Sequence, residues 1–212
     1  MQIKHPDWLQ IHRQQCGVLY GYNQDWYRTS FQRTRGCGPT AATMLLVYLN
    51  RRQPGSLPYE AGSLTAIADI LEEVWSFITP DRLLGLNSTG KFCEGADRLL
   101  SHYGLSWRCQ RLGVNALRKR RPSLGEIVRF LETALAADYP VAFLNLHRGK
   151  VAELESWHWM VITGLRYENA QDRYQITCYD NGRCLTVDLG LWLQTTRFGG
   201  GFVYIELPEN HE

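Results

Sequence analysis

Apolar residues recur at helical spacing through the first two-thirds of the chain. This periodicity predicts amphipathic helices, because positions three and four apart share one helix face. Ser123–Glu126 has the capping-box pattern that opens a helix, whereas Pro80 and Gly104 end the helices before them. Residues 85–92 are predicted to be loop, and residues 105–111 a short strand. The predicted helices cover about residues 40–51, 63–79, 96–103 and 123–135.

The last third of the chain has a different pattern. Short apolar runs separated by turn residues are typical of strands, and Asn181–Gly182 is a strong hairpin signal. A short helix is predicted over residues 191–195. Helices followed by an antiparallel sheet indicate an α+β fold in one domain, 1–212, with residues 1–30 as an irregular arm. The predicted strands cover residues 141–146, 158–165, 174–179, 183–187 and 202–207.

Charge and composition exclude several classes of protein. The 212 residues carry 23 basic and 21 acidic side chains, so no dominant attraction to nucleic acid or to a membrane is expected. The basic run Arg118–Arg121 is interpreted as a solvated loop. The polar N-terminus lacks the apolar core of a signal peptide, and no apolar run is long enough to span a bilayer. We therefore expect a cytoplasmic protein, with export by another route left open and the oligomeric state undetermined.

The cysteines do not form a metal-binding or disulfide pattern. No CxxC pair is present, so neither a metal site nor a cofactor is predicted. A two-residue hairpin loop sets Tyr179, not Cys178, opposite Cys184, which disfavours a bridge between those two cysteines. The expectation is reduced thiols. The six cysteines are Cys16, Cys37, Cys93, Cys109, Cys178 and Cys184.

Cys37 has a distinctive position, because it stands where an apolar helix begins. Free N–H groups and the positive end of the helix dipole at this point favour the thiolate, which is the reactive form. Gly36 and Gly38 let the backbone approach a substrate closely, and Pro39 suits the first helical turn. The alternative is a buried structural cysteine in a turn.

A nucleophilic cysteine needs a base, and His158 is the preferred candidate. It begins a strand that is apolar on both faces, so its imidazole must find a partner or line a cleft. His147 is followed by charged residues and is the second choice. His102 fits the end of a helix, where it complements the dipole. Solvent-exposed positions are expected for the remaining histidines, His5, His12 and His211.

Asp180 is the candidate for orienting that base. It ends the strand expected to pair with the His158 strand, where a carboxylate can accept a hydrogen bond from the imidazole and stabilise its charged form. The alternative is that Asp180 and Asn181 only shape the hairpin turn.

The order of cysteine, histidine and aspartate resembles that of the papain-like cysteine peptidases. Four motifs resemble the bacteriocin-processing, double-glycine peptidase-like branch in particular: Cys37–Ala42, Tyr139–Ala142, His158–Gly164 and Tyr179–Asp180. The match spans roughly residues 32–207. The chain departs from that pattern at Asn181, where the branch often has proline.

The resemblance implies a papain-like fold, with the nucleophile helix packed on the sheet, and a Cys37–His158–Asp180 triad. It also implies a glutamine in the oxyanion hole, some six residues before the cysteine. Gln32 stands five residues before Cys37, and Gln24 is the other candidate. The backbone N–H of Cys37 would be the second donor. Substrate contacts are expected from Gly36, Gly38, Trp157 and Trp159.

The expected function is hydrolysis of a peptide or small amide through an acyl-thioester. Two alternatives stay open at this point: an acyltransferase of transglutaminase type, and a non-catalytic binding or effector module. The loop between His147 and Trp157 is expected to be either a lid or specificity loop, or an ordinary surface loop.

Overall fold

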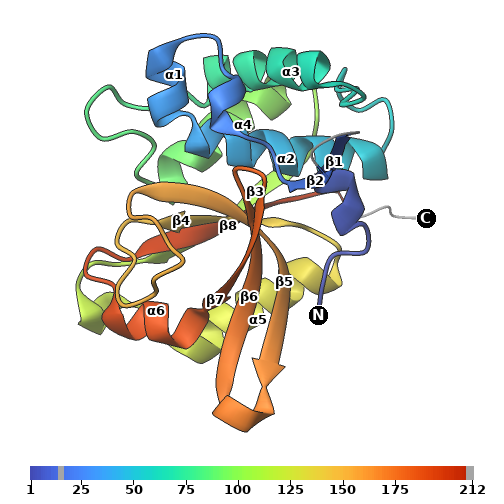
Figure 1. Ribbon diagram of the computed structural model, residues 1–212. Coiled ribbons are helices and arrows are strands. Elements are labelled where there is room, and N and C mark those ends of the chain that lie inside the picture. Colours follow the sequence, from blue (N-terminus) through green and yellow to red (C-terminus); the bar gives the residue numbers. More distant parts are fainter. Residues whose placement is uncertain (14–16, 209–212) are drawn as a thin grey trace.

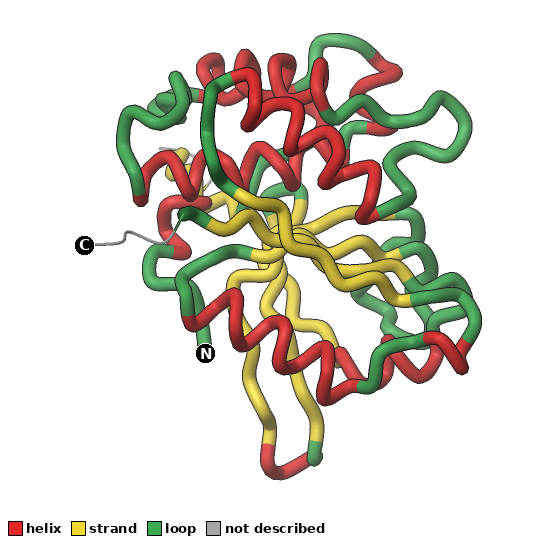
Figure 2. Tube along the Cα trace, turned by 180° about the vertical axis from the view of Figure 1, so that it is seen from behind, coloured by secondary structure: helices red, strands yellow, loops and turns green. Residues whose placement is uncertain are grey.

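The computed structural model describes residues 1–13 and 17–208, and shows a sheet between two layers of helices. In Figure 1, one layer of helices lies above the sheet and the other below it. Those above are α1 (Ser30–Arg35), α2 (Cys37–Arg52), α3 (Leu64–Phe77) and α4 (Thr89–His102). Those below are α5 (Leu124–Ala136) and α6 (Leu189–Thr195). Figure 2 shows the same layers from behind, with α5 across the lower face.

The main sheet has six antiparallel strands in the order β3-β8-β4-β5-β6-β7. The last strand of the described residues, β8, is inserted between β3 and β4. The α+β architecture predicted from the sequence is confirmed. The strands are β3 (Arg108–Val114), β4 (Val141–Asn145), β5 (His158–Glu168), β6 (Arg173–Asp180), β7 (Arg183–Asp188) and β8 (Gly200–Glu206).

Helix α2 is the central element of the upper layer. Every residue from Gly38 to Asn50 is buried, because α3 and α4 cover one side of the helix and β4 and β5 the other. A helix that is apolar on all sides is stable only in such surroundings. This burial fixes the position of the first residue of α2, Cys37.

Most predicted helices and strands are present, with shifted ends. The capping box at Ser123 is confirmed, since its hydroxyl accepts from the N–H of Glu126 and the Glu126 carboxylate accepts in return. Residues 89–92, predicted to be loop, belong to α4, whose N-cap is Ser88. Helix α1 was not predicted, although Thr29 and Gln32 form a second capping box. Strand β3 lies three residues later than expected.

The N-terminal arm is more regular than the sequence predicts. Strands β1 (Gln10–Arg13) and β2 (Gly17–Tyr20) pair as a two-stranded sheet, and the N–H of Tyr20 donates to the carbonyl of Gly182. The expectation of an irregular arm was therefore wrong, because β1 and β2 pair with each other and attach to the β6–β7 turn. Cys16 and His211 lie outside the described residues.

The register of β6 and β7 is that of a two-residue hairpin. Tyr179 is opposite Cys184 and Asp180 is opposite Arg183, with Asn181 and Gly182 at positive φ of 47° and 81°. The predicted register is confirmed, and Cys178 and Cys184 are free thiols. Over residues 1–13 and 17–208, the helices lack the combined length and hydrophobicity required to cross a membrane.

Candidate active site

Cys37 begins α2 directly after a one-residue break from α1. That break is Gly36, and a Cβ there would overlap the Tyr27 ring and lie 2.6 Å from the carbonyl oxygen of Gln32. A Cβ on Gly38 would lie 2.5 Å from Cδ2 of Leu86. Both glycines are buried, so their missing side chains make room for protein atoms. The structure therefore does not support the expected substrate contacts at Gly36 and Gly38.

His158 and Asp180 meet at one end of the sheet. His158 is the first residue of β5 and Asp180 the last of β6, so the antiparallel pairing of these strands brings them together. Nε2 of His158 and Oδ1 of Asp180 are 2.7 Å apart, and the residues are 6% and 5% exposed. A buried carboxylate at this distance holds the imidazole in one orientation.

The charge on the His158 imidazole is stabilised by its neighbours. Burial by itself lowers the pKa of His158, whereas the hydrogen bond to Asp180 and the nearby Cys37 thiol raise it. The balance raises the pKa to about 10. At neutral pH, a cationic imidazolium therefore lies beside the cysteine.

Arg183 extends the network on the sheet side and was not predicted. Its guanidinium lies 3.3 Å from Oδ2 of Asp180 and 3.3 Å from Oε1 of Glu155. Asp180 thus bonds His158 through one oxygen and Arg183 through the other. The contact was predictable from the hairpin register, because a two-residue turn places residue 183 opposite Asp180.

The predicted oxyanion glutamines have other partners. Nε2 of Gln32 donates to the Glu72 carboxylate at 2.5 Å, and its Oε1 accepts from Thr29 in the capping box of α1. Gln24 donates from Nε2 to the carbonyl of Arg33 at 2.8 Å. Both ends of the Gln32 amide are therefore engaged, the oxygen in the capping box of α1 and the nitrogen by Glu72 of α3, and its oxyanion role stays a prediction.

The two predicted tryptophans lie in different environments. Trp159 is 2% exposed, stacks near Phe92 and donates from Nε1 to the carbonyl of Leu86 at 2.5 Å. It is therefore a core residue that anchors the loop between α3 and α4, and not the substrate contact expected. Trp157, immediately before His158, is 50% exposed and has an unusual φ of 60°.

The loop from His147 to Trp157 is anchored along its length. Nδ1 of His147 accepts from the N–H of Gly149 at 3.0 Å, which is a turn contact. Val151 and Leu154 are buried, and the N–H of Lys150 donates to Thr195 in α6. Such anchoring does not fit a freely moving lid. It leaves Trp157, at the end of the loop, as the part that faces the site.

Two buried hydroxyls near the start of α2 were also not predicted from the sequence. Tyr27 and Thr40 are buried, and within the described part of the chain their oxygens have no hydrogen-bond partner. Burial raises the pKa of Tyr27, with the neighbouring Thr40 opposing that shift. No sequence pattern marks them, because their proximity arises only when the Tyr27 ring packs on Gly36.

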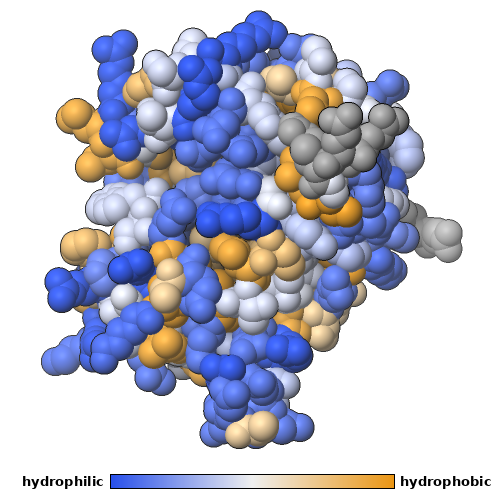
Figure 3. Space-filling view, in the orientation of Figure 1, coloured by the Kyte–Doolittle hydropathy of each residue, from blue (hydrophilic) through white to orange (hydrophobic). Residues whose placement is uncertain are grey.

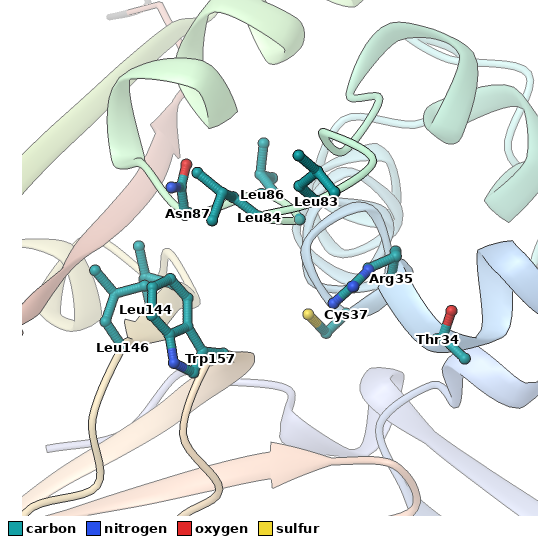
Figure 4. A pocket seen from close by; sticks show the side chains of 11 residues that line it. Thr34, Arg35, Cys37, Leu83, Leu84, Leu86, Asn87, Leu144, Leu146 and Trp157 are labelled. Atoms are coloured by element: carbon teal, nitrogen blue, oxygen red, sulfur yellow. The ribbon is translucent and has the colours of Figure 1, made fainter.

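A pocket of about 260 Å³ opens beside Cys37. Figure 4 shows apolar side chains on two sides of it and the Cys37 sulfur directed into the space between them. One side is the α3–α4 loop, including Leu83 and Leu84, and the other includes Leu144 and Trp157. The nucleophile candidate is therefore accessible, although its base and carboxylate partners are buried.

The residues of this site do not suit a metal. Among residues 1–13 and 17–208, no group of three or more histidine, cysteine or acidic side chains is arranged to hold an ion. The single histidine, thiol and carboxylate instead form a line from Asp180 through His158 to Cys37. Such a line suits proton transfer to and from a sulfur nucleophile.

Comparison with known proteins identifies the fold. The structure is similar to the crystal structure of UfSP from C. elegans, with a TM-score of 0.52 and 12% sequence identity. The similarity covers 82% of this chain and 30% of that chain. Neither a family model nor a curated protein sequence matches this chain. The fold is papain-like, as expected, while the double-glycine branch and the catalytic roles stay predictions.

Proposed function

We propose that the protein is a cysteine peptidase-like hydrolase that cleaves a peptide or small amide bond. The observation that carries this proposal is the buried hydrogen bond of 2.7 Å between His158 and Asp180, beside a cysteine that opens onto a pocket. Burying two ionisable groups has a large free-energy cost, and a core does not need such a pair for stability. Proton transfer to and from the Cys37 sulfur gives the pair a function.

The proposed reaction has two steps. The Cys37 thiolate attacks the carbonyl carbon of the amide, and the His158 imidazolium gives its proton to the departing amine as the C–N bond breaks. Water then attacks the thioester and gives a proton to His158, and the Cys37 thiolate leaves. The sum is one amide and one water converted to one acid and one amine.

The oxyanion of each step requires hydrogen-bond donors that are already in place. The backbone N–H of Cys37 fits this role, because N–H groups in the first turn of a helix have no acceptor within that helix. Gln32 and Gln24 are the side-chain candidates, although Nε2 of Gln32 donates to Glu72 and Nε2 of Gln24 donates to the carbonyl of Arg33. The negative charge would therefore develop at the positive end of α2.

Thiol reactivity tests the proposal without knowledge of the substrate. Iodoacetamide at pH 6 is expected to alkylate Cys37 faster than the exposed Cys184, with both rates measured by mass spectrometry. His158→Ala is expected to slow alkylation of Cys37 about 100-fold, because an ordinary thiol is almost entirely protonated at that pH. His147→Ala is the matched control and is expected to leave the rate unchanged.

Two outcomes separate this proposal from its alternatives. If Cys37 reacts no faster than Cys184 at pH 6, the proposal fails and a non-catalytic binding module is favoured. If Cys37 is reactive, a trapped acyl-enzyme can be offered water alone or water with added amines. Products that shift to new amides would identify an acyltransferase and contradict hydrolysis as the function.

A further inference from the structure

The pocket beside Cys37 is lined by apolar side chains that the fold itself does not bury. Leu83 is 82% exposed, Leu84 is 55% exposed and Trp157 is 50% exposed. In Figure 3 a group of hydrophobic residues lies at the left of the view, over the loop between α3 and α4. Single exposed apolar residues scattered over a surface are common and need no explanation. Several that converge on one pocket indicate a binding surface.

The loop between α3 and α4 is built to present its leucines. Oδ1 of Asp81 accepts from the N–H groups of Leu83 and Leu84 at 2.8 and 3.1 Å, and Asp81 and Gly85 bond each other through their backbones. The next residue, Leu86, is held by Trp159 and packs on Gly38. The turn is therefore fixed at its base, and its two leucines project from a firm support.

The opposite wall is also held in a specific conformation. Trp157 has a φ of 60°, a left-handed conformation that a bulky residue adopts only under strain. Its ring lies near that of Phe198, with centroids 6.1 Å apart, and Leu144 and Leu146 complete the wall. The backbone strain at Trp157 directs a large ring toward the pocket immediately before the base, His158.

One cation lies at the edge of this apolar space. Arg35, the last residue of α1, lines the pocket, and Figure 4 shows its side chain extended toward Cys37. In residues 1–13 and 17–208, Arg35 takes part in no ion pair. An unpaired guanidinium beside apolar walls suits a ligand that carries both a large apolar group and a carboxylate.

We propose that this pocket selects peptides with a large apolar side chain close to the scissile bond and an acidic side chain beside it. The apolar side chain lies between Leu83, Leu84 and Trp157, and the carboxylate binds Arg35. The volume of about 260 Å³ is below the roughly 300–1,000 Å³ of pockets for drug-sized ligands, which fits a pocket that takes only part of a peptide. This inference rests on the proposed function, whose substrate class it specifies.

Protection of Cys37 from alkylation tests the pocket directly. The probes are four pools of N-acetyl tripeptide amides. Every peptide contains alanine, either leucine or glycine, and either glutamate or glutamine. Each pool contains all orders of its three residues. Iodoacetamide is used at pH 8.5, where an ordinary thiol also reacts. The leucine–glutamate pool is expected to protect Cys37 at about 10- to 100-fold lower concentration than the glycine–glutamate pool, the effect of burying one leucine side chain.

Substitutions test which residues cause the preference for leucine and which cause the preference for glutamate. Leu83→Ser with Leu84→Ser is expected to remove the preference for leucine, and Arg35→Gln the preference for glutamate over glutamine. Leu117→Ser and Arg129→Gln, at exposed positions outside the pocket, are the matched controls. Equal protection by all four pools, or preferences that persist in the pocket variants, would overturn the inference. Peptide-free alkylation of Cys37 at pH 6 reports separately on the proposed function.

Discussion

The two sides of the candidate active site hold their functional groups by different means. On the sheet side, His158 and Asp180 stand on adjacent strands, and their 2.7 Å contact follows from strand pairing. On the helical side, Cys37 has no such ladder. Its position depends on packing: Tyr27 against Gly36, and the Trp159-anchored Leu86 against Gly38.

This difference shows which kinds of change each side tolerates. Charge and hydrogen bonding maintain the sheet side, so substitutions there are expected to alter reactivity strongly. Volume and shape maintain the helical side, where substitutions are expected to alter stability first. Four predictions follow this division, from the largest expected effect to the smallest.

The largest effect is expected from Asp180→Asn. The amide keeps the shape but not the negative charge that stabilises the His158 imidazolium, so alkylation of Cys37 at pH 6 is expected to fall about 10- to 100-fold, up to the loss expected for His158→Ala. Asp172→Asn, in the turn at the far end of the β5–β6 hairpin, is the matched control. A rate unchanged in Asp180→Asn would show that the carboxylate only shapes the turn.

The second effect is a dependence of stability on pH. The folded pKa of His158, about 10, exceeds its unfolded value of about 6.5, so the stabilisation is complete below pH 6.5 and is lost as the pH rises to 10. The difference in unfolding free energy between wild type and Asp180→Asn, measured in urea, is expected to shrink by a few kcal/mol over this range. A constant difference would mean that Asp180 does not raise the pKa of His158.

The third effect concerns the helical side. Gly36→Ala is expected to lower the free energy of unfolding by about 1–3 kcal/mol, because the new methyl group overlaps the Tyr27 ring. Gly125→Ala in α5 is the control, since its Cβ would meet no atom within 4 Å, and it is expected to be neutral or stabilising. Equal stability of both variants would remove the packing argument at Gly36.

The smallest effect is expected from Gln32→Ala. Loss of its capping-box contacts is expected to cost about 1 kcal/mol of unfolding free energy, and alkylation of Cys37 is expected to be unchanged. Once a substrate is found, its kcat is expected to fall less than twofold. A fall of 100-fold or more, the effect of removing an oxyanion donor, would restore the role expected from the sequence.

Local patterns were sufficient to predict the sheet side of the site. The Asn181–Gly182 turn fixes the hairpin register, and β5 follows from its apolar run, so the proximity of His158 and Asp180 was predictable. The same register places Arg183 opposite Asp180, so this contact was also predictable. The substrate contact expected at Trp159 was not found. Alternate residues of a strand face opposite sides of the sheet, and only the elements packed on each side show which face is buried.

The helical side was less predictable because its contacts join distant segments. Gln32 has the residue type and nearly the spacing of an oxyanion donor, yet Glu72, forty residues later, binds its amide. No pattern in the sequence marked Leu83 and Leu84 of the α3–α4 loop as pocket residues. Their relation to Cys37 depends on the hydrogen bond from Trp159 to Leu86, which no local pattern encodes.

The sequence by itself determined the order of helices and strands from α2 onward, the hairpin register and the three residues proposed for the chemistry. These features follow from interactions between near neighbours: periodicity, capping and turn geometry. Only the tertiary structure decided which side chains face the pocket, which glycines make room for packing and which glutamine is engaged elsewhere. Such choices depend on the close packing of segments far apart in the chain, where a single side chain excludes every other from the same volume.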